Sequence, residues 1–234
     1  MELSNDDFEL IIFPGKHPPK EYLEKYNKAY DCWRQVWEHA FQVELGRPES
    51  IPSDNFTRHD EILALFYKGE CAGLTFFSFD NDGSNWFRED SYFKRWPETA
   101  FKKLYTNGNK VMISCQFTLN FSFRKTHQNF PWKDLLLGVV VRRFVLSGFD
   151  AMCGTTRIAK NVDQASYRAG AVPIIKDMPF ADENDRVALL AWYRGMDSHS
   201  KVESVAGIVD YIYENKLTVL NNKFPILQEV KNAA

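Results

Sequence analysis

Cys115 lies in a run of alternating apolar and polar residues, and its thiol is a side chain of the type that serves in nucleophilic catalysis. A catalytic cysteine needs a histidine within reach and a polar setting, because the thiolate is the reactive form. His59 and His127 are candidates by type, but no sequence spacing joins either of them to Cys115. The apolar position of Cys115 therefore favours a buried structural thiol.

The histidines and cysteines show none of the spacings that hold a metal ion. The five histidines form no His-x-x-x-His pattern, and the four cysteines form no Cys-x-x-Cys pair. Residues 80–84 are rich in Asp, Asn and Gly but lack the later Glu of a calcium loop. Gly-x-Ser-x-Gly and Gly-x-Gly-x-x-Gly are also absent. The sequence predicts neither a metal nor a resident cofactor.

Charge and hydropathy limit which binding partners and which cellular location are expected. The chain has 234 residues, with 29 basic and 31 acidic side chains and a net charge of −2, so it lacks the basic surplus of a nucleic-acid binder. The longest apolar stretch, residues 135–141, is far too short for a membrane span. Residues 1–10 do not resemble a secretory signal, and the cysteines are isolated. We expect a single cytoplasmic domain over residues 1–234.

Aromatic residues are unusually frequent: 19 Phe, 10 Tyr and 6 Trp. Ten of the phenylalanines fall between residues 76 and 130. So many large flat side chains predict a heavy core, an apolar binding cavity, or both. Their clustering favours an apolar slot beside a cleft, with a Phe-rich core as the alternative.

Helices and strands alternate along the chain. Helices are predicted over residues 21–44, 132–147, 162–169 and 198–216, with part of 86–105 also helical. A hairpin is predicted from residues 62–67 and 71–79, and a long strand over 110–123 with one apolar and one polar face. Further strands are predicted near residues 8–13, 149–156, 171–175 and 186–193. This order predicts an α/β layered domain.

The residues at the start of the predicted short helix form a helix N-capping pattern. Asn161 is followed three residues later by Gln164, which predicts an N-cap with a variant of the capping box. The helix is then expected to end at Gly170.

Residues 111–172 resemble the core of the GCN5-related N-acetyltransferase superfamily, a group of acyl-transfer proteins. The resemblance rests on the long strand, the apolar helix, the next strand and the segment 161–171. That segment is similar to the superfamily pattern N-x-x-A-x-x-x-Y-x-x-x-G-F, with Asn161 and Gly170-Ala171 matching its ends and Ala165 and Tyr167 near their usual places. The resemblance implies a three-layer α/β/α fold with a central mixed, mostly antiparallel sheet. It places a C-terminal helical extension from about residue 198.

One motif of the superfamily differs in this chain. The superfamily usually carries a glycine-rich R/Q-x-x-G-x-G/A motif that cradles the coenzyme A pyrophosphate, whereas residues 124–132 contain no glycine. Relatives that use acyl carrier protein also lack the glycines: the acyl-homoserine-lactone synthases and the long-chain N-acyl amino acid synthases. The chain resembles them in Arg34-Gln35-Val36-Trp37, in the acidic loop 54–60 and in residues 136–158. It lacks the charged Glu and Arg that they carry on the long strand, which argues against lactone formation and leaves the amide-forming step open.

Acyl transfer to an amine needs a base for the ammonium proton, hydrogen-bond donors for the carbonyl oxygen and an acid for the leaving thiolate. The resemblance implies that the splayed end of a strand supplies N–H groups and that a tyrosine of the short helix protonates the thiolate. By match the acid is Tyr167, which would otherwise be a tyrosine that packs the short helix on the sheet. Candidate bases are acidic residues in and ahead of the hairpin: Glu61 and Asp60, with Asp54 and Glu44 as alternatives.

The resemblance also implies binding residues. The donor would be an acyl-coenzyme A or an acyl carrier protein thioester, used as a co-substrate, and its candidate ligands are Arg124, Lys125 and Asn161. The acceptor would be a small amine, with an amino acid as one candidate. Its candidate ligands are Arg34, Asp54 and Arg58, of which Arg58 either binds an acceptor carboxylate or pairs with Asp60. The alternative function is a non-catalytic relative that binds an acyl group or a protein partner.

Overall fold

The computed structural model describes residues 3–46, 51–80, 84–124, 130–180, 185–196, 203–221, 223–224 and 226. It contains an eight-stranded sheet in the order β6-β7-β5-β4-β3-β2-β1-β8. Its strands are β1 (Phe8–Pro14), β2 (Glu61–Tyr67), β3 (Glu70–Asp80), β4 (Val111–Leu119), β5 (Ala151–Arg157), β6 (Val172–Pro179), β7 (Arg186–Tyr193) and β8 (Leu217–Val219). The β4/β5 and β1/β8 pairs are parallel and the others antiparallel. The mixed, mostly antiparallel sheet that the resemblance implied is confirmed.

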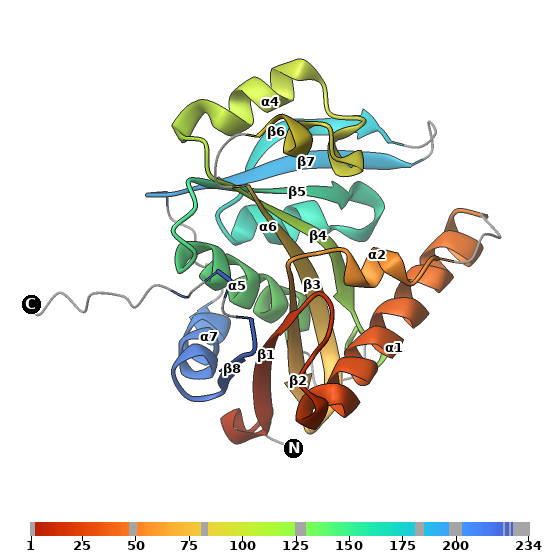
Figure 1. Cartoon of the computed structure of the whole chain (residues 1–234), viewed down its shortest axis with the longest axis vertical. Coiled ribbons are helices and arrows are strands. Elements are labelled where there is room, and N and C mark those ends of the chain that lie inside the picture. The colour runs from red at the N-terminus through yellow and green to blue at the C-terminus, as the bar shows by residue number, and fades with distance from the viewer. Residues whose placement is uncertain are drawn as a thin grey trace, which may run out of the picture.

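Helices cover both faces of the sheet. They are α1 (Leu23–His39), α2 (Asp54–Thr57), α3 (Asn85–Arg88), α4 (Glu98–Leu104), α5 (Trp132–Val145), α6 (Val162–Arg168) and α7 (Glu203–Asn215). Figure 1 shows α1 beside the β1–β3 half of the sheet and α4 beside β6 and β7. The residues of α5, α6 and α7 share one core with the opposite face. The three layers are therefore helix, sheet and helix.

The period-two pattern of the strands decides which side chains meet which layer. On β2, Leu63 and Leu65 pack toward α5 and α7, whereas Ile62, Ala64 and Phe66 pack toward α1. A central strand with helices on both faces has no solvent side, so the residues of β2 after Glu61 are apolar or aromatic. The same reason explains α5, which is apolar nearly all round because it lies between the sheet and α7.

The β2–β3 hairpin closes as its sequence predicts. Lys68 and Gly69 both adopt positive φ, at 51° and 76°, and strand pairing starts directly on either side at Tyr67 and Glu70. Two positive φ angles are the signature of the two-residue turn whose twist matches that of the strands. Gly69 adopts this conformation without steric cost.

The long strand ends earlier than its sequence pattern indicates. β4 stops at Leu119, and Phe121–Phe123 form a 3₁₀ turn instead of further strand. The Asn120 side chain explains the stop, because its oxygen accepts a hydrogen bond from the Ser122 N–H and its amide donates to the Cys71 carbonyl. Asparagine competes for backbone partners in this way and so favours turns.

The predicted capping box at Asn161 is wrong. Asn161 does not cap α6 through its side chain. It adopts a left-handed conformation with φ 51°, at the junction between a 3₁₀ turn (Ile158–Lys160) and the helix, and Gln164 donates to Asp163 instead. Asparagine tolerates this conformation better than most residues do, so it serves the junction rather than a capping box. The strand β8, which pairs with β1, was not predicted.

No helix within the described ranges combines the length and the apolar character needed to cross a membrane.

Candidate active site

Strands β4 and β5 diverge. Their parallel pairing covers Val111–Ser114 against Ala151–Gly154, yet β4 continues to Leu119 and β5 to Arg157. The divergence starts where β4 carries a bulge, since the β3–β4 register shifts between Leu74 and Phe76 and Gln116 adopts φ 51°. A bulge bends its strand and increases the local twist. This bend opens a space between two neighbouring strands of the sheet.

The bulge also changes which side chains share a face. Val111 and Ile113 pack with the α3–α4 side, as predicted for one apolar face, but Phe117 and Leu119 pack with the opposite core beside α5. The prediction of a single apolar face along the whole strand is therefore wrong. An extra residue in a bulge shifts the period-two pattern by one place, and no residue type in the sequence marks Gln116 as that residue.

A pocket of about 370 Å³ occupies this opening. One wall comes from the second half of α1, a second from the start of α5 and the turn before it, and a third from the end of β5 and the chain that follows. Its lining residues are Val36, Trp37, Ala40, Glu44, Gln116, Phe117, Leu119, Phe123, Arg124, Phe130, Pro131, Trp132, Lys133, Thr155, Thr156, Arg157, Lys160 and Val162. An apolar pocket with a few polar groups is typical of a site for a small ligand.

Two indole hydrogen bonds attach α1 to β4 beside the pocket. The Trp33 Nε1–H donates to the Gln116 side-chain oxygen, and the Trp37 Nε1–H donates to Thr118 Oγ1 at 2.9 Å. Residues four apart lie on one face of a helix and residues two apart lie on one face of a strand, so the two bonds run side by side. They fix the α1 wall of the pocket against the strand.

The charged part of the described lining is mainly cationic. Four of its residues carry a positive charge and one carries a negative charge: Arg124, Lys133, Arg157 and Lys160 against Glu44. Burial lowers the pKa of Arg124 and of Lys133, which means that desolvation opposes their charges. An anion in the pocket would relieve this cost.

Of the predicted donor ligands, Arg124 lies in the pocket lining. Asn161 lies between two lining residues, Lys160 and Val162, and is not itself one of them. Lys125 lies outside the described residues. Lys133, Arg157 and Lys160 were missed, because the elements that carry them come together only in the folded chain.

Tyr167, the predicted acid, lies on α6 and packs partly buried against the core beside α5. Burial and the neighbouring Asp163 carboxylate raise its pKa, so its hydroxyl keeps its proton at neutral pH. It is not among the pocket-lining residues. Its role as the acid stays a prediction.

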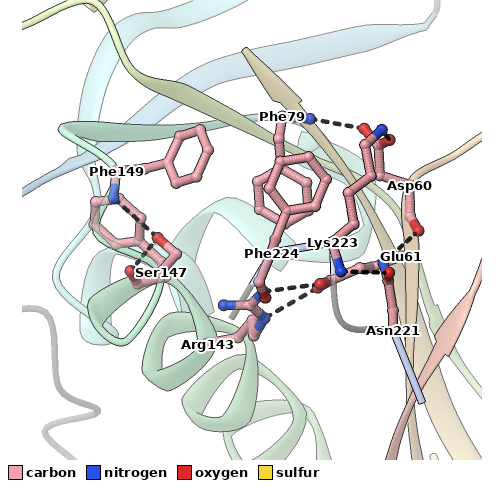
Figure 2. A network of polar contacts seen from close by, with 10 residues as sticks. Asp60, Glu61, Phe79, Arg143, Ser147, Phe149, Asn221, Lys223 and Phe224 are labelled. Carbon is pink, nitrogen blue, oxygen red and sulfur yellow. Dashed lines mark hydrogen bonds and ion pairs between the residues drawn. The ribbon is translucent and has the colours of Figure 1, made fainter. Parts of the chain in front are cut away.

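Glu61 and Asp60, the predicted bases, lie away from the pocket lining. Glu61 and Arg143 form a bidentate ion pair in which both side chains are fully buried (Figure 2). Asp60 accepts from the Phe79 N–H at 3.1 Å and pairs with Lys223 at 2.8 Å. Their catalytic roles stay predictions that this placement does not support.

Figure 2 shows how the C-terminal segment covers this pair. The Phe224 ring stacks on Phe79 with centroids 4.0 Å apart, and its carbonyl accepts a hydrogen bond from Arg143. The Asn221 side chain donates to the Asp60 carbonyl. The surroundings of Glu61 are therefore structural.

The predicted acceptor ligands are not brought together at the pocket. Arg34 is exposed and pairs with Glu38 one turn along α1 at 2.7 Å. Asp54 is exposed in the first turn of α2. Arg58 is exposed as well and donates to Ser91 Oγ at 3.4 Å, while Asp60 takes Lys223 as its partner.

Cys115 and His59 meet in the fold, although the sequence gives no sign of it. The Cys115 Sγ lies 3.8 Å from both ring nitrogens of His59, whose ring stacks on Phe76 at 4.7 Å. Burial raises the pKa of Cys115 to about 12, and burial with the Arg58 charge lowers the pKa of His59 to about 3. Both groups are neutral at pH 7, which agrees with a structural thiol rather than a nucleophile.

The phenylalanines between residues 76 and 130 pack in different cores of the fold and in the pocket lining. Phe76 packs under α1, and Phe77 and Phe79 pack toward α5. Phe87 and Phe93 form a separate core between the α3–α4 segment and the sheet. Phe117, Phe123 and Phe130 line the pocket. Both expectations, a Phe-rich core and an apolar slot, therefore hold for different members.

No group of His, Cys, Asp or Glu within the described ranges is arranged to hold a metal ion.

Several solved structures are similar to this chain. No protein-family model and no curated protein matches the sequence. FeeM, an N-acyl amino acid synthase from uncultured soil microbes, is a similar solved structure, with a TM-score of 0.53 and 14% identity, covering 81% of this chain and 93% of FeeM. BjaI, a CoA-dependent acyl-homoserine lactone synthase, is similar with a TM-score of 0.56 and 10% identity, covering 94% and 95%.

Arylalkylamine N-acetyltransferase 2 from Aedes aegypti is similar as well, with a TM-score of 0.52 and 13% identity, covering 80% of this chain and 99% of that protein. At these identities the likeness is one of fold. The chain thus has the fold of the GCN5-related N-acetyltransferase superfamily, with acyl-homoserine-lactone and N-acyl amino acid synthases among the structures it resembles.

Proposed function

We propose that this chain is an N-acyltransferase that moves an acyl group from a thioester donor to an amine. The observation that carries the proposal is the pocket at the divergence of β4 and β5, because it combines apolar walls with a cationic lining. The walls suit an acyl chain, and the cations suit the phosphate of a coenzyme A or carrier-protein arm. The similar synthases and acetyltransferase share the fold that forms such an opening.

In the proposed reaction the amine nitrogen attacks the thioester carbonyl carbon, the C–N bond forms and the C–S bond breaks. The amine proton passes to a base and the thiolate takes up a proton. Strand ends that diverge leave backbone N–H groups without a neighbouring strand, and such groups stabilise a developing oxyanion. Tyr167 stays the proposed acid and Arg124 a proposed donor ligand. A small amine stays the proposed acceptor, with an amino acid as one candidate.

The test is direct. The purified protein is incubated with acyl-coenzyme A, acyl carrier protein thioesters and acyl-N-acetylcysteamine, each with pooled amino acids and amines, and N-acyl products are sought by mass spectrometry. We expect an amide from at least one donor, with equal release of free thiol. Absence of any amide, from protein shown to be folded by circular dichroism, would contradict the proposal.

One observation favours a second candidate, a non-catalytic protein that binds an acyl thioester. Among the described residues of the pocket lining, Glu44 is the sole carboxylate, and it is held by Arg157 and Lys160. A site without a free base would bind the donor but not complete the transfer. Donor binding by calorimetry with no thiol release would support this candidate.

A further inference from the structure

Glu44 lies on the pocket wall, in the π-helical turn (Ala40–Glu44) that follows α1. One carboxylate oxygen lies 2.6 Å from Lys160 Nζ, and the other lies 3.2 Å from Arg157 Nη1. His39 Nδ1 lies 3.7 Å away. The carboxylate therefore joins α1 to the chain beyond β5, across the opening between the diverging strands.

The contacts of the four cations differ. Arg157 is shared between Glu44 and the buried Asp185 at 3.1 Å, and Lys160 contacts Glu44. Arg124 donates to the Leu119 carbonyl and Lys133 to the Lys160 carbonyl. Among the described residues neither Arg124 nor Lys133 has a carboxylate within ion-pair distance. Of the lining residues that the structure describes, Glu44 thus supplies the one negative charge that faces these four cations.

The Glu44 contacts are partly open to solvent, so an anion that enters the pocket can reach the same cations. The Lys160 and Arg157 side chains are 43% and 22% exposed, and Glu44 is 20% exposed. Water that reaches a partly exposed ion pair screens its charges, so such a pair is easier to separate than a fully buried one. The Glu61–Arg143 pair, with both side chains fully buried, is the opposite case.

We propose that the Glu44 carboxylate occupies the cationic site that a phosphate of the donor takes, so that donor binding displaces Glu44 from Lys160 and Arg157. The inference rests on the proposed function, since it supposes a donor with a phosphopantetheine arm. In a carrier-protein arm the phosphate is a diester with one negative charge and two free oxygens, and in coenzyme A it is part of a pyrophosphate with two charges, so either group can compete with one carboxylate for these cations. Arg157 keeps its contact with Asp185 in both states, and no bond is made or broken.

The test measures binding rather than turnover. Calorimetry compares 4′-phosphopantetheine with pantetheine, which lacks the phosphate, on wild type, Glu44→Gln and Glu38→Gln. Glu38 is the matched control, because it lies on α1 and pairs with Arg34 outside the pocket lining. In Glu44→Gln we expect phosphopantetheine to bind on the order of five-fold more tightly at low salt, since a like charge next to the phosphate is removed. Pantetheine binding and the Glu38→Gln protein should be unchanged.

Other outcomes overturn the inference. If Glu44→Gln binds phosphopantetheine no better than wild type, Glu44 does not compete. If both ligands gain equally, Glu44 only narrows the opening; if neither ligand binds wild type or variant, the site does not take a phosphate. Glu44→Asp, which keeps the charge but withdraws it by one methylene, gives an intermediate gain if the inference holds, and guards against a misfolded Gln variant.

The experiments distinguish failure of the Glu44 inference from failure of the proposed acyl transfer. Acyl-N-acetylcysteamine carries no phosphate, so amide formation from this donor, without the Glu44 effect, would leave the proposed function standing and remove the inference. Tighter phosphopantetheine binding in Glu44→Gln without amide from any donor would support the Glu44 inference and contradict the proposed acyl transfer.

Discussion

The Glu61 carboxylate receives two hydrogen bonds from the Arg143 guanidinium, at 2.8 and 3.0 Å, and neither side chain is exposed to solvent. The pair joins β2 to α5, so it links the sheet to the helix whose first turn lines the pocket. Burial raises the pKa of Glu61, and the Arg143 charge opposes that rise. The Glu61 carboxylate and the Arg143 guanidinium therefore each stabilise the charged form of the other.

We therefore expect Arg143→Met to lower the free energy of unfolding by about 3–5 kcal/mol, because it leaves the Glu61 charge buried without its partner. Urea denaturation measures the change. The control is Arg168→Met, which removes a half-exposed ion pair with Asp134 and should cost less than about 1 kcal/mol. The double variant Arg143→Met/Glu61→Leu should recover much of the loss. Equal losses in Arg143→Met and Arg168→Met would contradict this account.

His59 predicts a pH dependence of stability. Its folded-state pKa is lowered from 6.5 to about 3, mainly by burial. Between these values the unfolded chain binds a proton that the folded chain does not, so stability is lost as the pH falls from 6.5 toward 3. His59→Gln should reduce the slope of unfolding free energy against pH in this window by up to about 1.4 kcal/mol per pH unit. Identical slopes for the two proteins, from urea titrations at several pH values, would refute the prediction.

Cys115 should be inert as a nucleophile. With its pKa raised to about 12, the thiolate is a minor species at pH 8. We expect slow alkylation of Cys115 by iodoacetamide in the native protein, followed by peptide mass spectrometry, and rapid alkylation after unfolding. Cys115→Ala should retain acyl transfer. Fast native labelling, or loss of turnover in a folded Cys115→Ala protein, would restore the nucleophile hypothesis.

Trp37 should limit the length of the acyl chain, if the pocket holds that chain. Its ring forms part of the α1 wall, and Trp37→Ala would extend the space toward the helix. We expect kcat/KM to shift toward longer donors, with about 0.8 kcal/mol available for each added methylene that becomes buried. Trp37→Phe is the control, since it keeps a ring while losing the hydrogen bond to Thr118. A chain-length profile that is the same in Trp37→Ala and wild type would exclude this role.

The parts of the fold that the sequence predicts are those determined by local chemistry. Lys68-Gly69 closes a hairpin because glycine accepts positive φ, and the apolar run of α5 predicts a buried helix. Arg124, a candidate donor ligand because it stands where the resembled superfamily has its glycine-rich motif, lies in the pocket lining, and its role as a donor ligand stays a prediction. In each case the residues that decide the structure are neighbours in the chain.

The rest depends on contacts between distant segments. Gln116 adopts positive φ although it is not a glycine, and its hydrogen bond from Trp33 comes from a helix 83 residues earlier. Lys160 contacts Glu44 across 116 residues. An acidic residue such as Glu61 does not reveal in the sequence the arginine that pairs with it 82 residues later. Such pairs are set by tertiary packing.

The pairing of β8 with β1 and the docking of Phe224 on Phe79 have a consequence for synthesis. A ribosome-bound chain that has not yet reached residue 217 presents the outer edge of β1 without its neighbouring strand, and Arg143 without the Phe224 carbonyl. Exposed edges of this kind invite pairing with other chains. The nascent protein is therefore most open to pairing with other chains before residues 217–224 have left the exit tunnel.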